Sequence, residues 1–326
     1  MRIHIQNPPD DPLFAFDHAQ WEAAVRRNPD IGAGHEVSIA TDLPGFAAAA
    51  PEMEMLITWT GQARKLFPHP APKLKLISFT SAGLDRLAPF EWLPPGVTLL
   101  NNRGTHAAKA GEFALMAVLM LGNLMPRFAT AQREQRWDDG RARVLKGRGA
   151  VVVGLGTLGG AAAEQLARLG MKVTGVSFSG RSHPACARTV PVAEFDAVLP
   201  ETEFLVLACP LTDASRNLLS RERIALLPER AGVVNIGRGG LVDQDALCDA
   251  LDAGRIAGAV LDVFVPEPVP PGHRLWTTRN LTMTPHMSSD DPDTYNESTL
   301  DIFLDNLRAL RDGRALPNQV DPARGY

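Results

Sequence analysis

The sequence has few cysteines and no long hydrophobic run, and both absences narrow the class of protein. Its three cysteines, Cys186, Cys209 and Cys248, are widely spaced and odd in number, which suggests neither a disulfide framework nor a zinc site. No apolar run approaches the roughly 18 residues that a membrane-spanning helix needs. The first residues also lack the apolar stretch of a signal peptide. We therefore expect a cytoplasmic protein that binds neither a metal ion nor a membrane.

Positive charge is not in excess either. The 33 lysines and arginines are balanced by 37 acidic residues, which gives a formal net charge of −4 and a pI near 6.1. A chain with this charge balance lacks the excess of positive charge that is typical of proteins that bind nucleic acid. The hydrophobic content of 45% is that of an ordinary globular protein, and a length of 326 residues exceeds the size at which one core usually stops growing. Two domains are therefore expected.

A glycine-rich turn is the most informative feature that the sequence does contain. The apolar run 151–153 leads into Gly154-Leu155-Gly156-Thr157-Leu158-Gly159, a G-x-G-x-x-G pattern between a predicted strand and a predicted helix. In such a turn Gly154 permits the tight bend, Gly156 lets the backbone approach a pyrophosphate, and Gly159 lets the helix pack closely on the strand. The first N–H groups of the helix then hold the phosphates.

The surroundings of this turn decide between a cofactor site and a turn that is merely rich in glycine. A helical pattern over 161–169 is closed by Gly170, a typical C-cap, and a second strand follows at 172–176. The motif therefore lies inside a complete βαβ unit, which favours dinucleotide binding. We expect Thr157 and Leu158 to contact the cofactor beside the three glycines.

Strand-like and helix-like segments alternate along the chain, which indicates parallel sheets flanked by helices. The expected strands are 3–5, 36–39, 55–58, 74–78, 97–100, 151–153, 172–176, 204–207, 232–235, 259–261 and 281–283. A helix is expected over 19–26. Another, over 107–124, is apolar on nearly all sides, which predicts burial between larger masses.

The predicted fold is α/β, with two Rossmann-like domains built on doubly wound parallel sheets. A final amphipathic helix, 295–311, ends at Asp312-Gly313 and is expected to return to the first domain. That domain is therefore discontinuous. We expect a flavodoxin-like substrate (catalytic) domain over 1–103 and 288–326, and a dinucleotide-binding Rossmann domain over 104–287.

Three further motifs follow the glycine turn in a fixed order. They are Val234-Asn235-Ile236-Gly237-Arg238-Gly239-Gly240-Leu241-Val242-Asp243, Leu261-Asp262-Val263-Phe264-Val265-Pro266-Glu267-Pro268 and Thr284-Pro285-His286. Together they resemble the D-isomer-specific 2-hydroxyacid dehydrogenase family, and within it the glyoxylate and hydroxypyruvate reductases. The tail 306–326 is similar to the family's C-terminus. The resemblance covers most of the chain from about residue 74 onward.

The resemblance implies a catalytic trio of Arg238, Glu267 and His286. A guanidinium binds a carboxylate with two hydrogen bonds and polarises a neighbouring carbonyl, although a loop arginine is more often only a surface residue. An imidazole gives and takes a proton near neutral pH, although a lone histidine is more often structural. Glu267 in the matching position would orient the imidazole. Arg238 and His286 would also contact the substrate.

The resemblance implies further contacts to the cofactor and the substrate. Asp262 would bind the nicotinamide carboxamide; without the resemblance it would be interpreted as a cap or turn residue. Ser81, Ala82 and Gly83 resemble the loop whose N–H groups face the substrate carboxylate, and otherwise form a simple strand-to-helix turn. Further cofactor contacts are expected at Cys209, Pro210 and Ile236, with Cys209 packing rather than acting as a nucleophile.

The choice of cofactor depends on the end of the second strand of the βαβ unit. A carboxylate there takes the ribose hydroxyls of NAD, but this chain has Ser177 at that position. Without a carboxylate nothing repels a 2′-phosphate, and Ser177, Ser179 and Arg181 could bind one. Arg181 is otherwise a solvated loop residue. NADP is therefore the expected cofactor, with NAD as the alternative.

The function expected from the sequence is hydride transfer from NAD(P)H to a small 2-keto acid such as glyoxylate or hydroxypyruvate, giving the D-2-hydroxy acid. The alternatives are a nucleotide-sensing, corepressor-like binding protein and a phosphoglycerate dehydrogenase-like enzyme. Because the sequence stops soon after the returning helix, we expect no added regulatory domain, which disfavours the phosphoglycerate dehydrogenase alternative. A homodimer formed through the helix 107–124 is implied by the resemblance. No role is assigned to Lys109, which precedes the family-like Gly111-Glu112-Phe113.

Overall fold

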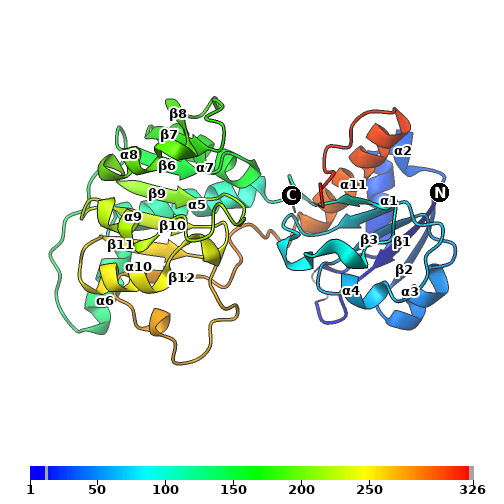
Figure 1. The fold of residues 1–326 in the computed structure, drawn as a ribbon, viewed down its shortest axis with the longest axis horizontal. Helices are drawn as coiled ribbons and strands as arrows, with labels where there is room; N and C mark the ends of the chain where they lie inside the picture. Colours follow the sequence, from blue (N-terminus) through cyan, green and yellow to red (C-terminus); the bar gives the residue numbers. More distant parts are fainter. Residues whose placement is uncertain (12–13, 323–326) are drawn as a thin grey trace. The chain divides into compact units, whose positions relative to one another are not determined.

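The chain folds into two compact α/β units, each built on one parallel sheet. The structure is a computed structural model that describes residues 1–11 and 14–322. Met1–His106 and Asp291–Tyr326 form the first unit, and Ala107–Asp290 form the second (Figure 1). These boundaries lie a few residues after the expected ones at 103 and 287. The α/β class with two doubly wound parallel sheets is confirmed, whereas the role of each unit stays a prediction.

The first unit is a five-stranded parallel sheet in the order β2-β1-β3-β4-β5, which is the flavodoxin-like order. Its elements are β1 (Arg2–Gln6), α1 (His18–Arg27), α2 (Pro29–Gly32), β2 (Glu36–Ala40), α3 (Leu43–Ala49), β3 (Met55–Thr58), α4 (Ala63–Leu66), β4 (Leu76–Phe79), β5 (Thr98–Leu100) and α11 (Tyr295–Arg311), with single 3-10 turns at Asp85–Leu87 and Phe90–Trp92. The inner strands β3 and β4 are buried along their whole length, as expected for a parallel sheet with helices on both faces.

Helix α11 comes from the far end of the chain and completes this unit. In Figure 1 it lies beside α1 and α2. Its Leu300, Phe303, Leu304 and Leu307 are buried in the same cluster as Ile3 and Ile5 of β1. The apolar residues recur at helical spacing, which is the pattern that buries one face of an amphipathic helix. The unit is therefore discontinuous because its core needs residues from both ends of the sequence.

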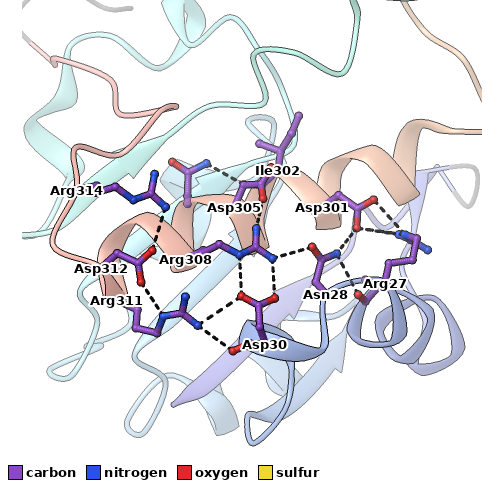
Figure 2. A network of polar contacts seen from close by, with 12 residues as sticks. Arg27, Asn28, Asp30, Asp301, Ile302, Asp305, Arg308, Arg311, Asp312 and Arg314 are labelled. Atoms are coloured by element: carbon purple, nitrogen blue, oxygen red, sulfur yellow. Dashed lines mark hydrogen bonds and ion pairs between the residues drawn. The ribbon is translucent and has the colours of Figure 1, made fainter.

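A network of ion pairs links the outer side of α11 to the turn between α1 and α2 (Figure 2). The carboxylate of Asp30 accepts two hydrogen bonds of 2.9 Å from Arg308, and Arg311 donates to the backbone oxygen of Asp30 at 2.9 Å. Asp301 pairs with Arg27 at 3.0 Å. The hydrogen bonds from Arg308, helped by the charge of Arg311, lower the pKa of Asp30 to about 2.

Removing the charge of Asp30 is expected to destabilise the first unit slightly and in a pH-dependent way. Because the folded-state pKa lies below the unfolded value, the stabilisation is present above about pH 4 and is lost as the pH falls toward 2. Asp30→Asn should lower the melting temperature by roughly 1–3 °C at pH 7 and low salt, since exposed ion pairs contribute little. Thermal melts from pH 7 to 3 should show the gap narrowing; a constant gap would contradict the assignment.

The second unit contains a seven-stranded parallel sheet in the order β12-β11-β10-β9-β6-β7-β8, the Rossmann order with one strand added. Its elements are α5 (Ala107–Gly122), α6 (Met125–Arg133), β6 (Gly149–Val153), α7 (Thr157–Arg168), β7 (Lys172–Ser177), β8 (Arg188–Pro191), α8 (Phe195–Val198), β9 (Phe204–Leu207), α9 (Arg221–Leu226), β10 (Gly232–Asn235), α10 (Gln244–Asp252), β11 (Gly258–Leu261) and β12 (Leu281–Met283), with 3-10 turns at Val192–Glu194, Leu199–Glu201, Gly239–Leu241 and Arg274–Trp276. Val151 and Val153 of β6 enter one core, and Ala150 and Val152 enter the core on the other face.

The long helix differs from the sequence prediction in two respects. It ends at Gly122, and a separate helix, α6, starts after Leu124, whose φ of +57° turns the chain. Within a single chain the predicted burial on all sides is not met, because Met116 on the outer face is 42% exposed. Of the helices in 1–11 and 14–322, none is by itself long and apolar enough to cross a membrane; α5 and α6 meet that test only as a pair bent by 60°.

Candidate active site

Three of the predicted site residues follow three neighbouring strands of the second sheet. Arg238 comes after β10, Asp262 directly after β11 and His286 after β12, and these strands pair in parallel in the order β10-β11-β12. Because parallel strands end at the same edge, the three residues lie on one side of the unit. This is the edge at which open α/β sheets bind ligands.

His286 and Glu267 form a direct pair. The Nδ1 atom of His286 lies 2.9 Å from Oε2 of Glu267. The other carboxylate oxygen, Oε1, accepts a hydrogen bond of 2.8 Å from the backbone N–H of Phe264, which fixes the carboxylate. The Glu267 side chain is 18% exposed and that of His286 is 39% exposed, so the imidazole is the more accessible partner. A carboxylate on Nδ1 requires that atom to donate and leaves Nε2 for proton exchange.

The backbone of His286 is held in an unusual conformation by Asp262. His286 has a φ of +53°, in the left-handed region that only a few per cent of residues other than glycine adopt. Its N–H donates to the backbone oxygen of Asp262 at 2.9 Å. The Asp262 carboxylate accepts hydrogen bonds from Thr284 Oγ1 at 2.6 Å and from the N–H groups of Met287 and Ser288 at 2.9 and 3.0 Å.

These contacts give Asp262 a structural task that the sequence did not reveal. The residue is fully buried, with an exposed fraction of 0%. Its carboxylate binds the chain on both sides of His286 and so sets the position of the imidazole. The contact with the nicotinamide carboxamide that the resemblance implies stays a prediction.

Arg238 is presented by a turn that Asn235 holds together. The Asn235 side chain accepts from the N–H of Gly237 at 3.1 Å and donates to the backbone oxygen of Arg238 at 2.9 Å. A Cβ on Gly239 would lie 2.3 Å from the oxygen of Phe264, so the Arg238 turn packs directly on the segment that orients Glu267. Asn235 was missed as a supporting residue, although a polar residue closing an apolar strand is a recognisable signal.

The glycine turn has the geometry that a dinucleotide pyrophosphate needs. Gly154 has a φ of +88°, and a Cβ there would lie 2.6 Å from Cα of Cys209. A Cβ on Gly159 would lie 1.7 Å from the oxygen of Gly154, whereas one on Gly156 meets nothing within 4 Å. Gly156 is also the N-cap of α7 and offers no side chain to its N–H groups. The open space and the N–H groups of the first turn fit a phosphate.

Other predicted cofactor contacts lie around this turn in different environments. Ser177 is the last residue of β7, and its buried Oγ makes no hydrogen bond within the described part of the chain. Burial raises the pKa of the Cys209 thiol to about 11, so at neutral pH it is protonated and packs on Gly154. Ile236 is buried, and Pro210, Ser179 and Arg181 are exposed. Whether these residues and the helix residues Thr157 and Leu158 contact a cofactor stays a prediction.

The predicted substrate loop belongs to the first unit, where it follows β4. Ser81, Ala82 and Gly83 are half-buried, and in residues 1–11 and 14–322 their backbone N–H groups donate no hydrogen bond. Such unused donors in a row suit an anion.

Lys109, in the first turn of α5, forms an ion pair of 3.7 Å with Glu112.

Comparisons with known proteins agree with the chemistry of this site. The model of the NAD-binding domain of D-isomer-specific 2-hydroxyacid dehydrogenases matches residues 115–288. Glyoxylate/hydroxypyruvate reductase B of Pectobacterium carotovorum subsp. carotovorum is 31% identical over 288 residues, which are 86% of this chain and 88% of that protein. The glyoxylate reductase/hydroxypyruvate reductase of Mus musculus is 31% identical over 268 residues, or 79% of this chain and 80% of that one.

Solved structures are similar over the whole chain. A D-isomer-specific 2-hydroxyacid dehydrogenase from Xanthobacter autotrophicus Py2, in complex with NADPH and MES, has a TM-score of 0.83 and 31% identity, covering 100% of this chain and 99% of that one. An NADPH-dependent glyoxylate/hydroxypyruvate reductase from Sinorhizobium meliloti, in complex with NADP and sulfate, has a TM-score of 0.82 and 26% identity with the same coverage.

Proposed function

The chain belongs to the D-isomer-specific 2-hydroxyacid dehydrogenase family of NAD(P)-dependent oxidoreductases, and we propose that it reduces a small 2-keto acid of the glyoxylate or hydroxypyruvate type to the D-2-hydroxy acid. We assign the cofactor to the second unit, expected over 104–287, and the backbone N–H donors for the substrate carboxylate to the first, expected over 1–103 and 288–326. The relatives named as glyoxylate and hydroxypyruvate reductases support the choice of substrate class.

Each catalytic residue of the second unit has its own role in the reaction. A bound nicotinamide supplies the hydride. The Arg238 guanidinium, which is always charged, binds the substrate carboxylate or polarises the keto oxygen. His286 donates a proton from Nε2 to that oxygen, because Nδ1 is engaged by Glu267. Glu267 stabilises the imidazolium before the proton leaves and keeps the ring in one orientation. In the oxidative direction the same imidazole accepts the proton.

The His286–Glu267 pair is the observation that carries this proposal. It lies at the ligand-binding edge of the sheet that also contains the glycine turn. The test is an NADPH-oxidation assay of the full chain with glyoxylate, hydroxypyruvate, pyruvate and phosphohydroxypyruvate. Turnover of glyoxylate or hydroxypyruvate is expected. A preference for phosphohydroxypyruvate would indicate a phosphoglycerate dehydrogenase-like enzyme, and NADPH binding without turnover would favour a nucleotide-sensing protein.

We also propose that NADP is preferred over NAD, because the end of β7 carries Ser177 in place of a carboxylate. Its Oγ is a buried polar atom without a hydrogen bond in the described residues, as expected for a group that binds a ligand. Ser179 and Arg181 follow on the exposed loop and would add a hydroxyl and a positive charge for the 2′-phosphate.

Placing a carboxylate at position 177 should therefore reverse the cofactor preference. In Ser177→Asp the ratio of kcat/KM for NADPH to that for NADH is expected to fall by about a hundredfold, since opposed like charges cost several kcal/mol. Ser177→Asn is the matched control, because it has nearly the same size without the charge. Steady-state kinetics with both cofactors gives the ratio. An equal fall in both variants would assign the effect to size and reject the proposed phosphate contact.

A cytoplasmic homodimer formed through α5 completes the proposal. The outer face of this helix presents Leu115, Met116, Leu119 and Met120, a row of partly exposed apolar side chains typical of an association surface. Sedimentation velocity should show a dimer, and Met116→Lys should shift it toward monomer because burying an unpaired charge is costly. A wild-type monomer at micromolar concentration would contradict the dimer.

A further inference from the structure

In the loop after β4, the backbone carbonyl groups of Thr80, Ser81 and Ala82 all accept hydrogen bonds. The oxygen of Thr80 accepts hydrogen bonds from Tyr295 Oη and, at 2.9 Å, from Nδ2 of Asn102. The oxygen of Ser81 accepts from the N–H of Asn102 at 3.1 Å. The oxygen of Ala82 accepts from Nδ2 of Asn101 at 3.0 Å. Three consecutive carbonyls are thus held by donors from α11 and from the two residues that follow β5.

This arrangement determines where the N–H groups of the loop point. In a peptide unit the C=O and the N–H point in opposite directions, so fixing the carbonyls of 80, 81 and 82 also fixes the N–H groups of 81, 82 and 83. Those three N–H groups are the ones that donate no hydrogen bond within the described residues. The clamp of Tyr295, Asn102 and Asn101 therefore aims three unused donors in a set direction.

The donors of the clamp are themselves rigid. Asn102 is 1% exposed, and its Nδ2 also donates to Thr299 Oγ1 at 2.7 Å. Thr299 in turn donates to the backbone oxygen of Tyr295 at 2.7 Å. Thr299 of α11 therefore links Asn102 to Tyr295. The Tyr295 ring packs edge-on against Phe14 with 4.7 Å between centroids. A buried network of linked hydrogen bonds of this kind favours one geometry.

We propose that Tyr295 and Asn102 are positioning residues for the substrate carboxylate, which they never touch. This inference rests on the proposed function. By binding the Thr80 carbonyl from two sides, they hold the N–H groups of Ser81, Ala82 and Gly83 ready for the two carboxylate oxygens of a 2-keto acid. The returning helix α11 then has a second task beyond its part in the core, because it supplies the hydroxyl that orders the binding loop.

The test is Tyr295→Phe, which removes only the hydroxyl and keeps the ring against Phe14. The KM for glyoxylate is expected to rise about three- to tenfold, the worth of one hydrogen bond, while kcat at saturation and the KM for NADPH stay unchanged. The methyl ester of glyoxylate has no carboxylate charge, so its kcat/KM should change much less. The preference for the acid over the ester should therefore shrink.

Two further variants separate positioning from general destabilisation. Phe303→Leu trims a buried side chain of α11 that does not contact the loop; it should lower the melting temperature and leave the acid-to-ester preference intact. Asn102→Asp keeps the shape but replaces the donor to Thr80 by an acceptor, and should reduce the preference further than Tyr295→Phe. If Asn102→Asp does not fold, the Tyr295→Phe result stands alone.

An unchanged KM for glyoxylate in Tyr295→Phe, or equal losses for acid and ester, would overturn the positioning role. A preference that falls equally in Phe303→Leu would also overturn it, because the effect would then follow stability. Failure of the proposed function is distinguishable, since the wild-type chain would then reduce no 2-keto acid before any variant is made.

Discussion

Replacing His286 by asparagine should abolish nearly all reduction of 2-keto acids while leaving the cofactor bound. Removal of a general acid costs about a hundred- to ten-thousandfold in kcat. Asparagine is the substitution of choice because His286 has a φ of +53°, which asparagine adopts more readily than alanine. The backbone contacts with Asp262 can then persist. Single-turnover assays of NADPH oxidation give the chemical step, and fluorescence titration gives the affinity for NADPH.

Glu267→Gln provides the graded control for this prediction. The amide oxygen can still accept from Phe264, but the amide that faces the imidazole carries no charge. The imidazole remains and its protonated form loses a partner, so kcat should fall less than in His286→Asn. Wild-type turnover in His286→Asn would refute the acid–base assignment. A lost affinity for NADPH in that variant would mean that the histidine serves the cofactor site instead.

The elements that position the site were predictable because the parallel sheet repeats one simple pattern. Apolar runs such as 151–153 and 204–207 are bounded by glycine or polar residues, and each of them is a strand. Since every ligand-binding turn of such a sheet follows a strand, the order of motifs along the chain also indicated one edge. The pairing of Glu267 with His286 was implied by the family resemblance, and the structure contains it.

What the sequence did not reveal depends on contacts between distant residues or on unusual backbone. Nothing in Leu124 marks the positive φ that separates α5 from α6, because leucine has no preference for that region. The edge strand β8 was missed because Arg188–Pro191 is short and only partly buried. Tyr295 and Thr80 are 215 residues apart, and the tasks of Asp262 and Asn102 likewise depend on partners that tertiary structure alone brings near.

Alanine at Gly159 and alanine at Gly156 should have different effects, although both change the same turn. The first should destabilise the fold, and the second should weaken cofactor binding. At Gly159 the new Cβ would lie 1.7 Å from the oxygen of Gly154, a backbone atom that cannot move away without breaking the turn. We expect a loss of roughly 4 kcal/mol or more in the free energy of unfolding, the range of severe overpacking. At Gly156 no atom lies within 4 Å and φ is −74°, so Gly156→Ala should melt like the wild type.

The open space beside Gly156 should nevertheless be needed for binding, since a methyl group there occupies the place of the pyrophosphate. Gly156→Ala is expected to weaken NADPH binding about tenfold or more, equivalent to about 1.4 kcal/mol. Gly160→Ala is the neighbouring control, because the one tight contact of its Cβ would be with the side chain of His183, at 3.0 Å, while the oxygen of Leu155 is at an ordinary 3.8 Å. Thermal melts and NADPH titrations of the three variants separate folding from binding. If Gly156→Ala binds NADPH normally, the phosphates lie elsewhere than at the start of α7. If Gly156→Ala melts as early as Gly159→Ala, Gly156 is needed for the packing of the turn, which would contradict the open space at this position.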